Sequence, residues 1–330
     1  MKILFWGTPA FAVPSLRALD DEGFEVVGVV TQPDRPAGRG RRLQASPVKD
    51  VALEQGFPVL TPDVPRGGEF LAAIRALEPD LSVVVAYGHI LRPEVLDLPP
   101  GGSINVHASL LPELRGAAPI HWAIARGFPT TGVTIMRMVE GLDAGPIIHQ
   151  VSEPVFDDGT SGDLTVRLSE LGAEALIEAL ALLAAGAAEE REQDHDAATF
   201  APKVDRAVAR IDWTRSATAV AAHVRGMDAA PGAWTQLGGT SVKLFRPGVW
   251  SEEEVGALEP GRLHNNGGAP TLPPETRSGT VMLASASDGV VVRCGQGAVA
   301  FHEVQPPGKR RMPVADWIHG RGIGVGQRFE

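Results

Sequence analysis

Short apolar runs and longer amphipathic stretches alternate along the first two hundred residues of this 330-residue chain. Apolar runs bounded by turn residues are typical of buried strands, and apolar residues at helical spacing indicate helices. The predicted strands are residues 2–6, 25–31, 81–86, 103–106 and 133–138. The predicted helices are residues 9–19, 47–55, 67–77, 119–125 and 160–188. This alternation predicts an α/β fold with an open, doubly wound, Rossmann-like sheet.

The pattern changes after residue 199, where a connector of about a dozen residues leads into short strand-like pieces separated by Gly and Pro. The predicted strands here are residues 233–237, 241–249, 281–284, 289–294 and 298–304. Many short strands favour a small barrel or sandwich, and residues 264–279 have the composition of a surface loop. The chain length also exceeds what one hydrophobic core usually serves. We therefore predict two domains, residues 1–204 and 205–330.

Several protein classes are disfavoured by the same sequence. The apolar run 179–188 is too short to span a bilayer and is bracketed by Glu178 and Glu189, so no membrane span is expected. The first residues lack the pattern of a signal peptide, which favours a cytoplasmic protein. Cys294 is the single cysteine, which excludes an intrachain disulfide and a thiolate zinc cluster. We expect Cys294 to be a buried structural thiol.

Charge is unevenly distributed along the chain, whose formal net charge is −10. Residues 1–204 carry 16 Lys and Arg against 28 Asp and Glu, so the acidic excess belongs to the first predicted domain. A basic segment interrupts that domain and contains Arg35, Arg39, Arg41, Arg42 and Lys49. Its guanidinium groups suit phosphate contacts, although a run of this kind is equally compatible with a solvated flexible loop.

Three polar side chains could converge after the predicted strand 103–106. Asn105 and His107 are two residues apart and can share one face, and Asp143 follows the next strand in a Gly-containing turn. Open α/β sheets place ligands at the carboxyl ends of their strands. Taken singly, Asn105 capping a turn, His107 as a buried histidine and Asp143 as a turn residue are the simpler interpretations.

Together these residues belong to longer motifs. INVHASLLP followed by GLDAG resembles the signature of folate-dependent formyltransferases. MKILFWGTPAFAVPSL, VVGVVTQPDRPAGRGRRLQASPVK, VVVAYGHIL, INVHASLLPELRGAAPIHWAI and TGVTIMRMVEGLDAGPII are similar, in order, to the formyltransferases that act on methionyl-tRNA. The second domain resembles the OB-like C-terminal β-barrel of that family more loosely, through KVDRAVARIDW and VQPPGKRRM. The 264–279 loop departs from the family and is interpreted as an insertion.

The resemblance implies catalytic roles for the three polar residues. The family transfers a formyl group from 10-formyltetrahydrofolate to the amino group of methionyl-initiator-tRNA, with no metal and no covalent enzyme intermediate. Asn105 and a charged His107 are expected to stabilise the oxyanion that forms when the amine attacks. Asp143 is expected to hold His107 charged and oriented, and to take the amine proton through water.

Two segments are expected to hold the folate co-substrate. By resemblance, one lining segment consists of Ser109, Leu110, Leu111 and Pro112. The other follows the buried strand 81–86, where a pterin ring could lie against Tyr87, Gly88, Ile90 and Leu91. The GTPAF turn after the first strand lacks the G-x-G-x-x-G spacing, so a dinucleotide cofactor has little support.

The basic segment bears on the acceptor. The resemblance implies that Arg39, with support from Arg41 and Arg42, enters the acceptor stem of the tRNA. Candidates for contacts with the RNA backbone in the second domain, each of which is by itself better explained as a plain surface charge, are Arg206, Arg210, Lys243, Arg246, Lys309, Arg310 and Arg311. The preferred oligomeric state is a monomer.

Two alternative functions remain. One is formyl transfer to a small amine such as glycinamide ribonucleotide or an amino sugar, and the other is a non-catalytic RNA-binding module.

Overall fold

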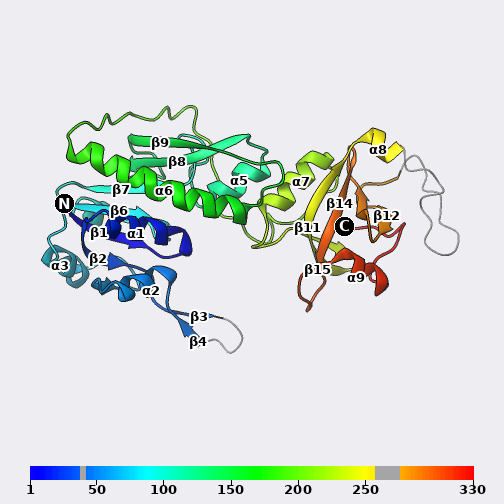
Figure 1. The fold of residues 1–330 in the computed structure, drawn as a ribbon, viewed down its shortest axis with the longest axis horizontal. Coiled ribbons are helices and arrows are strands. Elements are labelled where there is room, and N and C mark those ends of the chain that lie inside the picture. Colours follow the sequence, from blue (N-terminus) through cyan, green and yellow to red (C-terminus); the bar gives the residue numbers. More distant parts are fainter. Residues whose placement is uncertain (38–41, 257–275) are drawn as a thin grey trace. The chain divides into compact units, whose positions relative to one another are not determined.

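The computed structural model describes residues 1–37, 42–256 and 276–330 (Figure 1). Within these ranges the chain divides into two compact units. The first comprises residues 1–119, 130–154 and 163–202, and the second comprises residues 120–129, 155–162 and 203–330. Two short segments that precede residue 204 in the sequence thus pack with the second unit.

The first unit is built on one mixed sheet. In the described residues its strands are, in spatial order, β5 (Val59–Leu60), β2 (Glu25–Val30), β1 (Lys2–Gly7), β6 (Leu81–Val85), β7 (Ser103–His107), β8 (Thr130–Arg137) and β9 (Ile147–Pro154). The strands from β5 to β7 pair in parallel, whereas β8 and β9 are antiparallel. The predicted Rossmann-like α/β class is confirmed, and the antiparallel edge was not predicted.

Helices cover both faces of this sheet. They are α1 (Val13–Asp21), α2 (Pro47–Glu54), α3 (Gly68–Ala76), α4 (Pro93–Leu96) and α6 (Ser161–Ala184). The helix predicted over 9–19 begins later, because Ala10–Ala12 forms a 3₁₀ turn and α1 then starts with a proline in its first turn. Proline fits there because the first amide groups of a helix have no partner in the helix. Ser46 caps α2 by accepting a hydrogen bond from the Lys49 N–H at 3.0 Å.

The register of the strands assigns Asn105 to one face. Trp6 lies beside Val84, Val84 beside Asn105, and Asn105 beside Met136 in four adjacent strands. Side chains directly opposite one another in paired strands point to the same face. Residues of α3 and α4 pack with Trp6 and Val84, so these short helices lie on the Asn105 face.

The longest helix, α6, lies on the opposite face, in front of the sheet in Figure 1. A Cβ added at Gly172 of α6 would lie 3.1 Å from a methyl group of Val106. Val106 neighbours Asn105 in β7 and therefore points the other way. The helix α6 therefore covers the Val106 face closely, whereas shorter helices and loops cover the Asn105 face.

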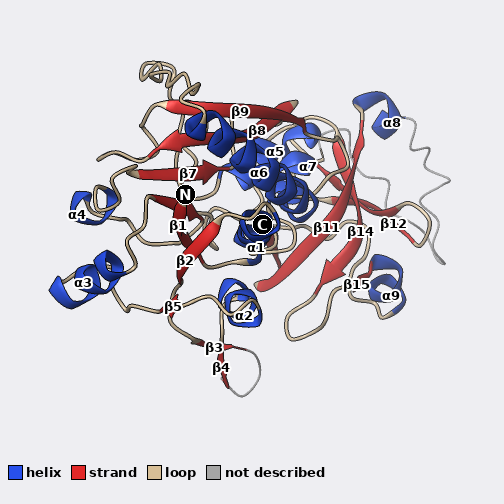
Figure 2. Ribbon diagram, turned by 60° about the vertical axis from the view of Figure 1, so that its left-hand side comes forward, coloured by secondary structure: helices blue, strands red, loops and turns tan. Residues whose placement is uncertain are grey.

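The second unit is a small antiparallel β structure. Its strands are, in spatial order, β10 (Trp234–Leu237), β11 (Thr240–Trp250), β14 (Ala298–Gln305), β13 (Gly289–Arg293) and β12 (Val281–Ser285), with β15 (Met312–Pro313) on β14. The long strands β11 and β14 run side by side (Figure 2). Every strand predicted here is confirmed, each within two residues of its predicted bounds.

The last residues of the chain close this sheet into a barrel. Gln236 of β10 exchanges backbone hydrogen bonds with Glu330, at 3.1 and 2.9 Å. On the other side, Phe329 N–H donates to Gly279 O at 2.8 Å, just before β12. The two edge strands are therefore joined through the C-terminal segment, and Phe329 stacks on Trp213 inside with ring centroids 5.7 Å apart.

Three helices that the structure describes in the second unit were not predicted, namely α7 (Ala217–Gly226), α8 (Glu252–Gly256) and α9 (Val314–His319). Of these, α7 does carry a signal in the sequence, since Ser216 caps it by accepting from Ala219 N–H at 3.3 Å. α5 (Pro119–Ala125) matches its prediction. Among the described residues, no helix is long and apolar enough to cross a membrane.

Candidate active site

His107 ends β7 and is 5% exposed. Its Nε2 lies 3.1 Å from the carbonyl oxygen of Leu114, and its Nδ1 lies 3.7 Å from Oδ2 of Asp143. Both ring nitrogens thus face oxygen atoms of the protein, and the ring lies between a backbone carbonyl and a carboxylate.

Asp143 reaches His107 by a route that the sequence did not predict. The sequence pattern places the two residues at a shared carboxyl edge of the sheet, but β8 is antiparallel to β7 and its carboxyl end lies beside Ile104. The 138–146 turn doubles back to bring the carboxylate to the ring. Asp143 adopts a left-handed backbone, with φ of 48°, and its Oδ2 accepts a hydrogen bond from Gly116 N–H at 2.8 Å.

Asn105 is the third member of the predicted group. It is partly exposed, and among the described residues its side chain has no hydrogen-bond partner. A polar side chain without a protein partner is free to bind water or a ligand. The amide can donate through its NH₂ group and accept through its oxygen. The structure therefore brings His107, Asp143 and an unengaged amide together at the end of β7.

The segment after β6 presents a mixed set of groups. Tyr87 is buried against Trp6, with ring centroids 5.2 Å apart, and burial raises the pKa of its hydroxyl to about 12. Leu91 is also buried, whereas Ile90 is 91% exposed and Gly88 has a φ of 89°. An exposed isoleucine beside a left-handed glycine leaves both an apolar side chain and backbone groups accessible.

The predicted 109–112 segment is more deeply packed than its neighbour. Ser109 is fully buried and donates through its hydroxyl to Glu113 O at 2.6 Å, and Leu111 packs in the core with Met136. Leu110 and Pro112 are half-buried. The latter two side chains are the ones that remain accessible to a ligand in this segment.

The basic segment contains a small hairpin of β3 (Arg35–Ala37) and β4 (Arg42–Gln44). Arg42 is exposed at the start of β4, while Arg39 and Arg41 lie outside the described residues. At the base of the hairpin Lys49 forms a 2.7 Å ion pair with Asp34. Arg42 is therefore available for an external contact, whereas Lys49 is already paired.

Some of the predicted basic contacts of the second unit already have a partner in the protein, and others are exposed. Arg311 makes a two-pronged ion pair with the buried Asp228, at 2.7 and 3.2 Å, so its guanidinium has a structural partner. Arg206 lies over the Trp234 ring at 4.3 Å. Lys309 and Arg310 are exposed. The exposed pair is better placed than Arg311 for a contact with phosphate.

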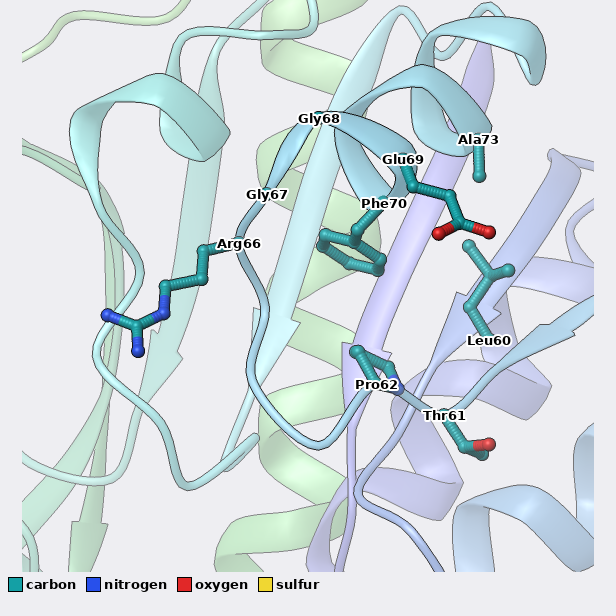
Figure 3. Close-up of a pocket in the computed structure, with 9 residues that line it drawn as sticks. All are labelled: Leu60, Thr61, Pro62, Arg66, Gly67, Gly68, Glu69, Phe70 and Ala73. Carbon is teal, nitrogen blue, oxygen red and sulfur yellow. The ribbon is translucent and has the colours of Figure 1, made fainter.

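One cavity of about 530 Å³ lies apart from these residues. Figure 3 shows Phe70 and Pro62 at its walls and the Arg66 side chain pointing away. None of the predicted site residues lines it, although Phe70 packs on the same core cluster as Tyr87. The candidate site at the end of β7 is therefore separate from this cavity. Within the described residues, no group of three His, Cys, Asp or Glu side chains is placed to hold a metal ion.

Comparison with protein families defines the class. Residues 1–180 match the formyl transferase family, and residues 203–322 match the formyl transferase C-terminal domain. The fold, the site and these matches define a formyl-transferring enzyme. Methionyl-tRNA formyltransferases from Methylococcus capsulatus and Symbiobacterium thermophilum are 45% and 44% identical over 329 residues, which cover 100% of this chain and 99% and 95% of theirs. The chain belongs to the methionyl-tRNA formyltransferase family.

Solved structures support the fold. HypX from Aquifex aeolicus in complex with tetrahydrofolic acid aligns with 98% of this chain and 48% of its own, at a TM-score of 0.61 and 20% identity. A methionyl-tRNA formyltransferase from Clostridium thermocellum aligns with 75% of this chain and 93% of its own, at a TM-score of 0.54 and 15% identity. At these identities the likeness concerns the fold alone.

Proposed function

We propose that this protein transfers the formyl group of 10-formyltetrahydrofolate to the amino group of methionyl-initiator-tRNA, giving N-formylmethionyl-tRNA for translation initiation. The observation that carries the proposal is the pairing of His107 with Asp143 beside the unengaged amide of Asn105. Relatives that are 41–45% identical over nearly the whole chain bear the name of this activity. Because tRNA charging and initiation take place in the cytoplasm, we place the reaction there.

The three side chains suit the charges that this reaction develops. Attack of the amine nitrogen on the formyl carbon forms the new C–N bond and puts negative charge on the formyl oxygen. Asn105 donates a hydrogen bond to that oxygen, and the positive charge of His107 stabilises it. Asp143 takes the proton lost by the amine through water and passes it on to the folate nitrogen. The bond from the formyl carbon to that nitrogen then breaks, and the formyl oxygen becomes a carbonyl again. No step needs a metal ion.

Folate use is supported by the family and by the accessible groups near the site. We propose that the co-substrate lies along residues 87–91 and 109–112, with Ile90, Leu110 and Pro112 offering apolar contact. Backbone groups around Gly88 offer hydrogen bonds to a heterocycle. The HypX structure that shares this fold is a complex with tetrahydrofolic acid.

We propose that Arg39, Arg41 and Arg42 contact the acceptor stem of the tRNA, and that residues 205–330 form a tRNA-binding domain. An exposed hairpin arginine such as Arg42 suits a phosphate, because its guanidinium can donate two parallel hydrogen bonds. We also propose that the protein acts as a monomer.

The test is incubation with 10-formyltetrahydrofolate and one of two acceptors, methionyl-initiator-tRNA or glycinamide ribonucleotide. We expect formylation of the tRNA alone. Formylation of the ribonucleotide instead would overturn the proposed acceptor while leaving the chemistry intact. No product with either acceptor would favour a non-catalytic RNA-binding module.

A further inference from the structure

Residues 191–201, which follow the first unit's last helix, lie between two loops of the active site. On one side Arg191 exchanges backbone hydrogen bonds with Ile147, at 2.9 and 2.8 Å. On the other side Ala201 N–H donates to the carbonyl oxygen of Arg115 at 2.7 Å. The segment therefore joins two stretches that are some thirty residues apart in the sequence.

Gln193 holds the loop that carries Asp143. Its Nε2 donates to the carbonyl oxygens of Asp143 and Gly145, at 2.9 and 2.7 Å. Its Oε1 accepts from Nε and Nη2 of Arg115, at 3.1 and 2.6 Å. Gln193 is 5% exposed and Arg115 is 6% exposed. Because the donor and acceptor atoms of the Gln193 amide are all engaged, the amide has one favourable orientation. It therefore holds the backbone of Asp143 in place.

Thr199 holds the other partner of His107. The Thr199 hydroxyl accepts from Leu114 N–H at 2.9 Å, and the Leu114 carbonyl faces Nε2 of His107 at 3.1 Å. Leu114 has a φ of 59° and Asp143 a φ of 48°. A residue with a side chain adopts this region only where its surroundings hold it. Both residues that face the His107 ring are thus left-handed, and each is held by a side chain of the same segment.

We propose that Gln193 and Thr199 are positioning residues for the His107–Asp143 pair. They touch no reacting atom, and they act by fixing the two backbone sites that orient the ring and the carboxylate. A misplacement of about 1 Å in such a pair can lower a rate by about 100-fold. The catalytic part of this inference rests on the proposed function, whereas the structural part does not.

Gln193→Met tests the first of these residues, because methionine has a similar length and no hydrogen-bonding amide. We expect kcat for formyl transfer to fall about 10- to 100-fold, with KM for both substrates changed by less than about twofold. In an Asp143→Asn background, the same substitution is expected to change kcat by less than about twofold, because it acts through Asp143. An unchanged kcat, or an equal loss in both backgrounds, overturns the proposal.

Thr199→Val tests the second residue by a separate route and does not disturb Arg115. Its matched control is Thr131→Val in β8, because the Thr131 hydroxyl is buried and has no hydrogen-bond partner among the described residues. We expect a loss of about tenfold or more in kcat for Thr199→Val and a normal kcat for Thr131→Val. Equal rates in the two variants would remove Thr199 from the proposal.

Hydrogen exchange of the Gly116 amide separates this inference from the proposed function. That amide donates to the Asp143 carboxylate, so its exchange reports the position of Asp143 without any substrate. We expect exchange about tenfold faster in Gln193→Met and unchanged in Thr131→Val. If the natural protein formylates neither acceptor, the proposed function fails and this measurement still decides the positioning role. Unchanged exchange in Gln193→Met overturns it.

Discussion

His107 presents Nδ1 to Oδ2 of Asp143 at 3.7 Å while its Nε2 faces the Leu114 carbonyl at 3.1 Å. The first distance is longer than a direct hydrogen bond, whereas the second is that of a normal one. The Nε2 side of the ring is therefore engaged by the protein. We accordingly expect direct donation to the formyl oxygen to come from Asn105 and the contribution of His107 to be electrostatic.

Replacement of Asn105 by alanine removes that donor. We expect Asn105→Ala to lower kcat by about two to three orders of magnitude, the usual effect of losing one oxyanion donor. Single-turnover formylation of methionyl-tRNA measures the chemical step, and folate binding measured by fluorescence serves as the control. Near-normal turnover with intact folate binding would remove Asn105 from the mechanism.

Asp143→Asn keeps the shape of the side chain and an acceptor for Gly116 N–H, but removes the charge opposite His107. We expect kcat to fall by about 100-fold or more. The substitution removes both the negative charge that faces the His107 ring and the group that accepts the amine proton. The matched control is Glu190→Gln, which removes an exposed carboxylate paired with Arg137 at 2.8 Å. That variant is expected to keep normal turnover, since exposed ion pairs contribute little. Equal turnover in the two variants would contradict the assignment.

Substitutions in the basic segment are expected to affect tRNA binding and to spare folate binding. Arg39→Ala and Arg42→Ala should each weaken tRNA binding and reduce the slope of log affinity against log salt by about one for each phosphate that is no longer neutralised. Arg17→Ala is the control, because Arg17 is an exposed arginine of α1 outside the hairpin. Transfer that does not depend on salt in the natural protein would count against phosphate recognition.

Acid is expected to destabilise the second unit through His223 of α7. Burial is the main cause that lowers the pKa of His223 below its usual 6.5, and its Nε2 has no hydrogen-bond partner among the described residues. Below pH 6.5 the unfolded chain binds a proton that the folded chain resists, so the free energy of unfolding rises with pH up to about 6.5 and then levels. His223→Asn removes this titration.

Urea unfolding at pH 5 and pH 7.5 checks the effect. The natural protein should lose more stability at the lower pH than the His223→Asn variant. His121 retains part of the acid sensitivity in both, since burial also lowers its pKa. The same loss of stability in both proteins would contradict this prediction, because it would show that His223 takes up its proton equally in the folded and the unfolded chain.

Cys294 is expected to be unreactive in the folded protein. It is 1% exposed, and burial raises the pKa of its thiol to about 12, so almost no thiolate is present at neutral pH. A thiol reagent should label the protein only after denaturant is added. The expected stoichiometry is then one, because the chain has a single cysteine. Rapid labelling without denaturant would contradict the buried position.

Much of the fold could be predicted because local patterns carry it. The apolar, β-branched run of β6 is fully buried, and the strands of the second unit were predicted as short apolar pieces separated by Gly and Pro. The direction of β8 could not be predicted, since parallel and antiparallel edge strands share one hydrophobic pattern. The helices of the second unit were missed because short strands with Gly and Pro dominate its composition.

The sequence by itself determined that Asn105 and His107 stand two residues apart at the end of a strand, because side-chain alternation is a local property of the backbone. It also determined the basic character of the hairpin. Only the tertiary structure decided how Asp143 turns back to His107 and that Gln193 and Thr199 hold the two left-handed residues around the ring. These contacts join segments that are 50 and 85 residues apart, and no local pattern encodes such pairs. They form when the whole unit packs, because buried polar groups must find partners wherever the fold places them.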